Sequence, residues 1–207
     1  KHPECKAFDR CIHSCPNGCL SVSGKIVSSK ELSELILKNK DFFEMTRGGV
    51  TFSGGEPMLQ SEFVCEVVDS LVGIHKAIQT SGFADLETYK RIVDKFDFVM
   101  QDIKFADEAE HIKYTGVSNE RILNNIEFLK ERGENFVFRV PLIPGITDTT
   151  ENLEGISRIV GESPVELLKY NPLSSAKYEM LDMEYELSVN KNRDEDFTKY
   201  FSNAKMG

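Results

Sequence analysis

The segment GGVTFSGGEP, residues 48–57, joins a short strand to a glycine turn and a carboxylate. Apolar and polar side chains alternate over residues 50–53, as they do along a strand. Gly54 and Gly55 then let the backbone approach a ligand closely, because neither residue has a Cβ. The turn lacks the Gly-Lys-Ser/Thr ending of a phosphate-binding loop, so with Glu56 it suits an ammonium group. A tight turn with a solvated glutamate is the alternative.

Four more apolar strands are predicted along the chain, each followed by a helix or a connecting segment. Capping-box spacing predicts helix starts at Ser28 with Glu31 and at Asp148 with Glu151. Apolar residues in the polar tail predict a last helix near residues 197–201. This alternation predicts a parallel α/β sheet, either doubly wound or a barrel. The four strands are residues 74–79, 98–103, 136–143 and 165–170.

Both folds place ligands at the carboxyl ends of their strands. Asp102 and Lys104 are two residues apart, so they project to one face, where a buried ion pair is the alternative to a ligand site. Lys104 can hold a carboxylate, and Asp102 can accept from hydroxyls or bind a cation. Arg139 can point into the same site or pair with Asp102. The other candidates at strand ends are Gln79, Thr80 and Asn171.

The composition restricts the partners. The 207 residues carry a formal net charge of −9, and Lys and Arg form no patch, which argues against nucleic acid and anionic membranes. No apolar stretch has the length that spans a bilayer.

Four of the five cysteines lie in the first twenty residues. Such a cluster without a secretory signal is typical of metal ligands in a reducing compartment, so we expect a cytoplasmic protein. The step Cys15-Pro16 is similar to ferredoxin-type iron–sulfur motifs, although the usual Cys-x2-Cys steps are missing. Structural zinc and a disulfide are the alternatives. The cluster comprises Cys5, Cys11, Cys15 and Cys19.

Several motifs together resemble the glycyl-radical-enzyme activating enzymes, the family of pyruvate formate-lyase activating enzyme within the radical S-adenosylmethionine (SAM) enzymes. They occur in the family's order between Cys5 and Tyr178. The motifs are GGVTFSGGEP at 48–57, QTSGF at 79–83, MQDIK at 100–104 and RVPLIPG at 139–145.

This resemblance implies a partial parallel (β/α) barrel over residues 28–207, with residues 1–27 as the remainder of a ferredoxin-like insert. The family's Cys-x3-Cys-x2-Cys motif, which holds the catalytic [4Fe–4S] cluster, does not occur in these 207 residues. The resemblance therefore implies a piece that lacks the first barrel strand and is inactive alone. It also implies that the N-terminal cysteines hold one or more auxiliary [4Fe–4S] clusters.

The resemblance also implies roles for individual residues. Gly54, Gly55 and Glu56 would receive the amino end of SAM, and Lys104 its carboxylate. Arg139 would point into the cavity. Gln79 and Asn171, where some members have Asp and His, leave details of the cofactor hydrogen bonds open. A monovalent cation would be held by Thr80, Met100 and Asp102.

The activity implied is reductive cleavage of SAM to a 5′-deoxyadenosyl radical, which takes a hydrogen atom from a glycine of a partner enzyme. The partners would be that glycyl radical enzyme and an electron donor such as flavodoxin or ferredoxin. Two other functions stay open: a radical SAM enzyme acting on a small molecule, and a non-catalytic SAM-binding barrel. A Cys-x3-Cys-x2-Cys motif upstream of Lys1 would exclude the second.

Overall fold

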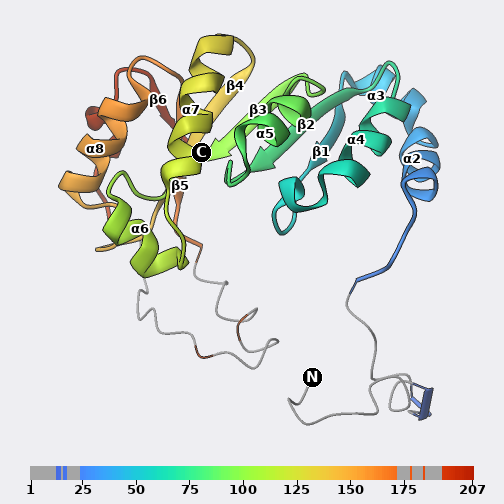
Figure 1. The fold of residues 1–207 in the computed structure, drawn as a ribbon, viewed down its shortest axis with the longest axis horizontal. Helices are drawn as coiled ribbons and strands as arrows, with labels where there is room; N and C mark the ends of the chain where they lie inside the picture. The colour runs from blue at the N-terminus through green and yellow to red at the C-terminus, as the bar shows by residue number, and fades with distance from the viewer. Residues whose placement is uncertain (1–12, 15, 18–23, 172–177, 179–183, 185–192) are drawn as a thin grey trace. The chain divides into compact units, whose positions relative to one another are not determined.

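A computed structural model describes residues 13–14, 16–17, 24–171, 178, 184 and 193–207 (Figure 1). The chain forms two compact units, one of residues 1–27 with 171–190 and one of residues 28–170 with 191–207. The second unit holds the sheet and the helices described below. That residues 1–27 belong to a ferredoxin-like insert stays a prediction.

Six parallel strands form one sheet in the order β1-β2-β3-β4-β5-β6. The five predicted strands are all present, each within one residue of its expected bounds at either end. No strand pairs with the outer edge of β1 among the described residues. The strands are β1 (Gly49–Phe52), β2 (His75–Thr80), β3 (Phe98–Asp102), β4 (Phe136–Leu142), β5 (Val165–Lys169) and β6 (Ala204–Met206).

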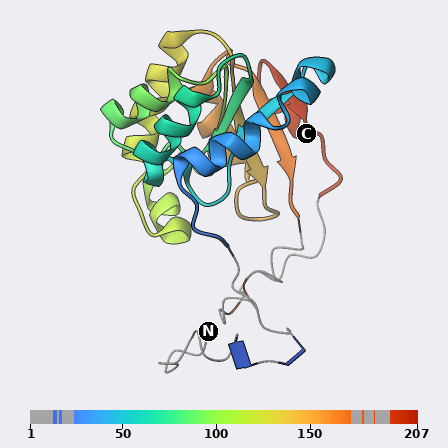
Figure 2. The ribbon, with the colours of Figure 1, turned by 90° about the vertical axis from the view of Figure 1, so that its right-hand side faces the viewer.

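The helices lie on one side of the sheet, as Figure 2 shows. A strand order without a reversal requires every right-handed crossover to run in the same direction, which puts all connecting helices on one face. A doubly wound sheet reverses its order and has helices on both faces. The partial parallel barrel is therefore confirmed. Its helical elements are α2 (Ser29–Leu37), α3 (Lys40–Thr46), η1 (Pro57–Gln60), α4 (Ser61–Ser70), α5 (Leu86–Val93), α6 (Glu108–Thr115), α7 (Glu120–Arg132), α8 (Thr150–Val160) and η3 (Phe197–Tyr200).

The register divides the strand residues into two faces. We call the helix-covered side the outer face and the other side the inner face. Residues paired in a parallel ladder point to the same side, so Gln101 opposite Phe138 belongs to the outer face and Asp102 opposite Arg139 to the inner face. The outer face forms the core with the helices, and its fully buried strand residues include Ile78, Val99, Phe138, Val140 and Leu167.

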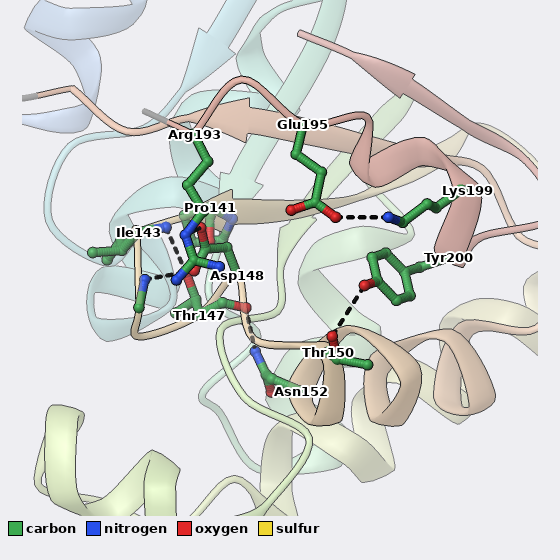
Figure 3. Close-up of polar contacts among 11 residues, drawn as sticks. Pro141, Ile143, Thr147, Asp148, Thr150, Asn152, Arg193, Glu195, Lys199 and Tyr200 are labelled. Carbon is green, nitrogen blue, oxygen red and sulfur yellow. Dashed lines mark hydrogen bonds and ion pairs between the residues drawn. The ribbon is translucent and has the colours of Figure 1, made fainter. Parts of the chain in front are cut away.

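The prediction of a C-terminal helix is wrong. Residues 197–200 form only a 3₁₀ turn, Phe201 is extended, and the chain continues into β6. β6 is three residues long and pairs with β5, so tertiary contacts rather than a local pattern determine it. Figure 3 shows how this segment is attached: Arg193 Nε lies 3.3 Å from Asp148 Oδ2, and the Tyr200 hydroxyl 3.1 Å from Thr150 Oγ1.

The two predicted capping boxes differ in outcome. Ser28 and Glu31 form the reciprocal pair that begins α2. At α8 the prediction is wrong, because Thr149 is the N-cap and its side chain accepts from the amide of Asn152. The Asp148 carboxylate instead accepts from the amide of Gly145 and so closes the turn before the helix.

Candidate functional site

One cavity at the carboxyl ends of β1, β2 and β3 gathers most of the predicted site residues. Its volume is about 210 Å³. Drug-sized ligands occupy roughly 300–1,000 Å³, so this cavity has room for only a part of such a ligand. Neither Met100 nor Arg139 lines it. The lining residues are Ser53, Gly54, Gly55, Glu56, Gln79, Thr80, Ser81, Asp102 and Lys104.

The turn after β1 is open to a ligand. Gly54 has a φ of +112°, a conformation that residues with a Cβ rarely adopt. A Cβ on Gly54 or on Gly55 would meet no atom within 4 Å. The space that these missing side chains leave is therefore available to a bound group that approaches the backbone.

Glu56 joins this turn to the loop after β2. Its Oε1 accepts from the Met58 amide at 3.1 Å and the Thr80 hydroxyl at 2.6 Å. Its Oε2 accepts from Ser81, from the amide at 2.8 Å and the hydroxyl at 2.6 Å. A carboxylate has about four lone-pair sites, so these four donors use them. Glu56 is thus a fixed link in this structure rather than a solvated glutamate, and direct contact of its carboxylate with a ligand ammonium stays a prediction.

Asp102 and Lys104 line the same cavity, Asp102 from the inner face and Lys104 from the segment that follows β3. Asp102 Oδ1 is buried and has no hydrogen-bond partner among the described residues. Burial raises the pKa of Asp102, while the nearby charges of Lys104 and Arg139 act in the opposite direction. A buried carboxylate oxygen without a donor is costly. The geometry thus offers Asp102 to a cation or a hydroxyl donor and Lys104 to an anion.

Arg139 does not pair with Asp102. Its Nε lies 3.0 Å from Glu166 Oε2, on the strand at its other side. The motif analysis missed Glu166, although a charged residue within the apolar strand VELLK was a signal.

The three predicted cation ligands are not all on one face. Met100 and Asp102 share the inner face, whereas Thr80 is opposite Gln101 and therefore belongs to the outer face. The Thr80 hydroxyl donates to Glu56, as described above. The cation site thus stays a prediction, and a side-chain ligand from Thr80 would require that bond to break.

A buried polar network supports the loop after β2. Gln101 is fully buried, and its Oε1 accepts from the Tyr89 hydroxyl. Burial raises the pKa of Tyr89, so this donor keeps its proton. Gly82 packs against Gln101 so closely that a Cβ there would lie 2.5 Å from the amide nitrogen. Asn125 Nδ2 donates to the carbonyls of Gly82 and Ala84, at 2.8 and 3.0 Å. Sequence reasoning missed the roles of Gln101 and Asn125.

The predicted iron–sulfur ligands fall outside the described residues. This applies to Cys5, Cys11, Cys15 and Cys19. Cys65 is the one cysteine that the structure describes, and it is buried and free, as a core residue is. Within the described residues no group of three His, Cys, Asp or Glu side chains could hold a metal ion. Those residues therefore do not fit an iron–sulfur cluster.

A second cavity, of about 310 Å³, lies at the ends of β4 and β5. Two of its acidic lining residues form ion pairs: Asp148 with Arg193, which also lines the cavity, and Glu195 with Lys199, which does not, at 2.6 Å (Figure 3). It lacks the open glycine turn of the first cavity, and none of the predicted cofactor-binding residues lines it. We therefore take the first cavity as the candidate site. Asn171 belongs to the other compact unit, and its predicted role stays a prediction.

Two curated relatives are similar to the chain over most of its length. The trans-4-hydroxy-L-proline dehydratase activating enzyme of Clostridioides difficile is 40% identical over 178 residues, which are 82% of this chain and 59% of the relative. The 4-hydroxyphenylacetate decarboxylase activating enzyme of Clostridium scatologenes is 37% identical over 193 residues, or 89% of this chain and 61% of the relative. The chain thus spans about three fifths of the relatives it matches.

A solved structure and a family model agree with these relatives. A crystallised domain of pyruvate-formate lyase-activating enzyme from Bacteroides vulgatus ATCC 8482 superimposes with a TM-score of 0.62 at 27% identity, covering 77% of this chain and 99% of that domain. The model of the Radical SAM superfamily matches residues 9–154. Because this match covers more than half of the chain, the chain belongs to the radical SAM superfamily, whose members use S-adenosylmethionine and a [4Fe–4S] cluster.

Proposed function

We propose that the chain is the SAM-binding part of a glycyl-radical-enzyme activating enzyme. The observation that carries the proposal is the single cavity formed by the Gly54-Gly55-Glu56 turn, Asp102 and Lys104. The names of the two relatives support the assignment, since both are activating enzymes for another enzyme. A small-molecule radical SAM enzyme has no comparable support.

The residues of the cavity fit the amino-acid end of SAM. Open backbone at Gly54 and Gly55 gives the ligand ammonium room to reach carbonyl groups. Lys104 would bind the carboxylate through a charge-assisted hydrogen bond, which contributes about 1.5–3 kcal/mol. The unpartnered oxygen of Asp102 would take a monovalent cation, with Met100 beside it on the same face.

When bound, SAM supplies reductive carbon–sulfur cleavage and a radical that removes a hydrogen atom from a glycine. The described residues bind and orient the cofactor and limit water at its amino-acid end. Gln79 lies at the cavity wall, where its amide can hydrogen-bond the cofactor. Arg139, on the same inner face but outside the cavity lining, would point toward the cavity.

The partner would be a glycyl radical enzyme, and the electron donor a flavodoxin or ferredoxin, in the cytoplasm. The net charge of −9 disfavours nucleic acid and anionic membrane as partners. Among the described residues no helix combines the length and apolarity needed to cross a bilayer. For Cys5, Cys11, Cys15 and Cys19 we propose an auxiliary [4Fe–4S] cluster, which iron analysis would detect as more than four irons per full-length chain.

Electron paramagnetic resonance tests the proposed activity. The full-length protein is reconstituted anaerobically with iron and sulfide and mixed with SAM, a reductant and a candidate glycyl radical enzyme. We expect a glycyl radical signal on the partner and none on a partner whose radical-site glycine is alanine. SAM cleavage that requires a small molecule and never yields the protein radical would contradict the proposal.

A further inference from the structure

Four charged side chains form one row across four strands. The register aligns Asp102 of β3 with Arg139 of β4, Arg139 with Glu166 of β5, and Glu166 with Lys205 of β6. All four are on the inner face, and their charges alternate in sign. Arg139 is therefore placed between two carboxylates.

Arg139 is paired with only one of these carboxylates. Its Nε lies 3.0 Å from Glu166 Oε2, and both side chains are largely buried, with exposed fractions of 17% and 21%. This contact is an ion pair only, because Nε makes no hydrogen bond to a described residue. On its other side Asp102 Oδ1 accepts no hydrogen bond from a described residue. The register nevertheless places Asp102 directly opposite Arg139, so the two residues are neighbours across the strands.

We propose that Glu166 is a positioning residue that holds Arg139 away from Asp102 and so keeps the Asp102 carboxylate open to a ligand in the cavity. The identity of that ligand, the amino-acid end of SAM with a cation, rests on the proposed function. The positioning itself depends only on this chain's own residues.

The energetics favour such a competition. Removing one charge of a largely buried ion pair leaves the other charge uncompensated, which is costly, so the guanidinium is expected to move to another carboxylate. If Glu166 loses its charge, Asp102 is the carboxylate directly opposite Arg139 in the register. Lys205 is a weaker neighbour of Glu166, with its Nζ 3.7 Å from Oε1 and 72% of its side chain exposed. Removing Lys205 should leave the Arg139–Glu166 pair in place.

A crystal structure of the Glu166→Gln protein tests the positioning directly. We expect the Arg139 guanidinium within hydrogen-bond distance of the Asp102 carboxylate, and unmoved in the matched control Lys205→Met. A guanidinium that stays beside residue 166 in the Glu166→Gln protein would overturn the proposal. This readout needs no bound cofactor, so it stands even if the proposed function fails.

A double-mutant cycle on SAM affinity tests the consequence. Glu166→Gln should weaken binding roughly ten- to a hundredfold, since the ligand must displace a charge-assisted hydrogen bond at Asp102. In an Arg139→Met background the same change should have no further effect, because the competing guanidinium is gone. An equal loss in both backgrounds, or unchanged affinity with a lower melting temperature, would show a merely structural role. A wild-type protein that binds no SAM would contradict the proposed function, and the crystal structure would then decide the positioning role.

Discussion

The two faces of the sheet are built from the same strands but have different chemistry. On the outer face Phe138 is fully buried among apolar side chains. The next residue, Arg139, is on the inner face and forms an ion pair with Glu166. On the neighbouring strand Asp102 is opposite Arg139, and its Oδ1 accepts no hydrogen bond from a described residue. Adjacent residues of one strand thus belong to two regions with different roles. The outer face stabilises the fold, and the inner face keeps charged groups near a cavity at some cost in stability.

The largest loss of stability should follow from truncating a buried side chain on the outer face. Phe138→Ala removes a fully buried ring from the central part of the sheet, and such changes lower the free energy of unfolding by about 3–5 kcal/mol. Urea denaturation measures the loss. The matched control on the inner face, Met100→Ala, should cost clearly less because that side chain is only partly buried. Equal losses would mean that the two faces do not differ as described.

Glu56→Gln tests the link between the two loops that border the cavity. The new amide group would face two donors of Ser81 instead of accepting from them. Leaving such donors unsatisfied costs about 1–3 kcal/mol, and the partial exposure of Glu56 favours the lower end. Thermal denaturation measures this loss, and Glu127→Gln, at an exposed helical ion pair, is the control. A protein with unchanged stability would show that the four hydrogen bonds are dispensable.

The smallest effect should be a pH dependence from Asp102. Burial raises its pKa above the ordinary 3.8, so the folded state favours the protonated form. The stability that this proton contributes is present below pH 3.8 and is lost as the pH rises through the higher folded pKa. Asp102→Asn should therefore be more stable than the wild type at neutral pH, with the gain vanishing in acid. Urea unfolding at several pH values checks this, and a destabilised Asp102→Asn protein at neutral pH would indicate that Asp102 is tightly paired.

Much of the outer face could be predicted from the sequence. Apolar runs such as residues 136–143, bounded by Gly133 and Gly145, predict a strand because local pattern and burial agree. The turn at Gly54 could be predicted from its two adjacent glycines, which have no Cβ. β6 could not be predicted, since three residues contain no period and their pairing depends on β5. Asp148 and Thr149 are both good capping residues, and the contact of Asp148 with Gly145 decides between them.

The partners on the inner face could not be predicted either. Strand alternation places Asp102, Arg139 and Glu166 on one side, but only the register shows that Arg139 lies between the two acids. Register depends on sheet assembly across distant segments, which a single sequence does not encode locally. The contacts of Glu56 with Thr80 and Ser81 join residues 24 and 25 positions apart, so local pattern does not predict them either.

Calorimetric titration of SAM into the reconstituted full-length protein and its Lys104→Ala variant tests the central claim most directly. Losing one charge-assisted hydrogen bond to the ligand carboxylate should weaken binding by about ten- to a hundredfold. The melting temperature should hardly change, because Lys104 contributes no apolar side chain to the core. Lys113→Ala, at an exposed helical ion pair, should bind as the wild type does. If Lys104→Ala and Lys104→Met lower the melting temperature while affinity stays unchanged, Lys104 only neutralises Asp102 and the cavity is not the cofactor site.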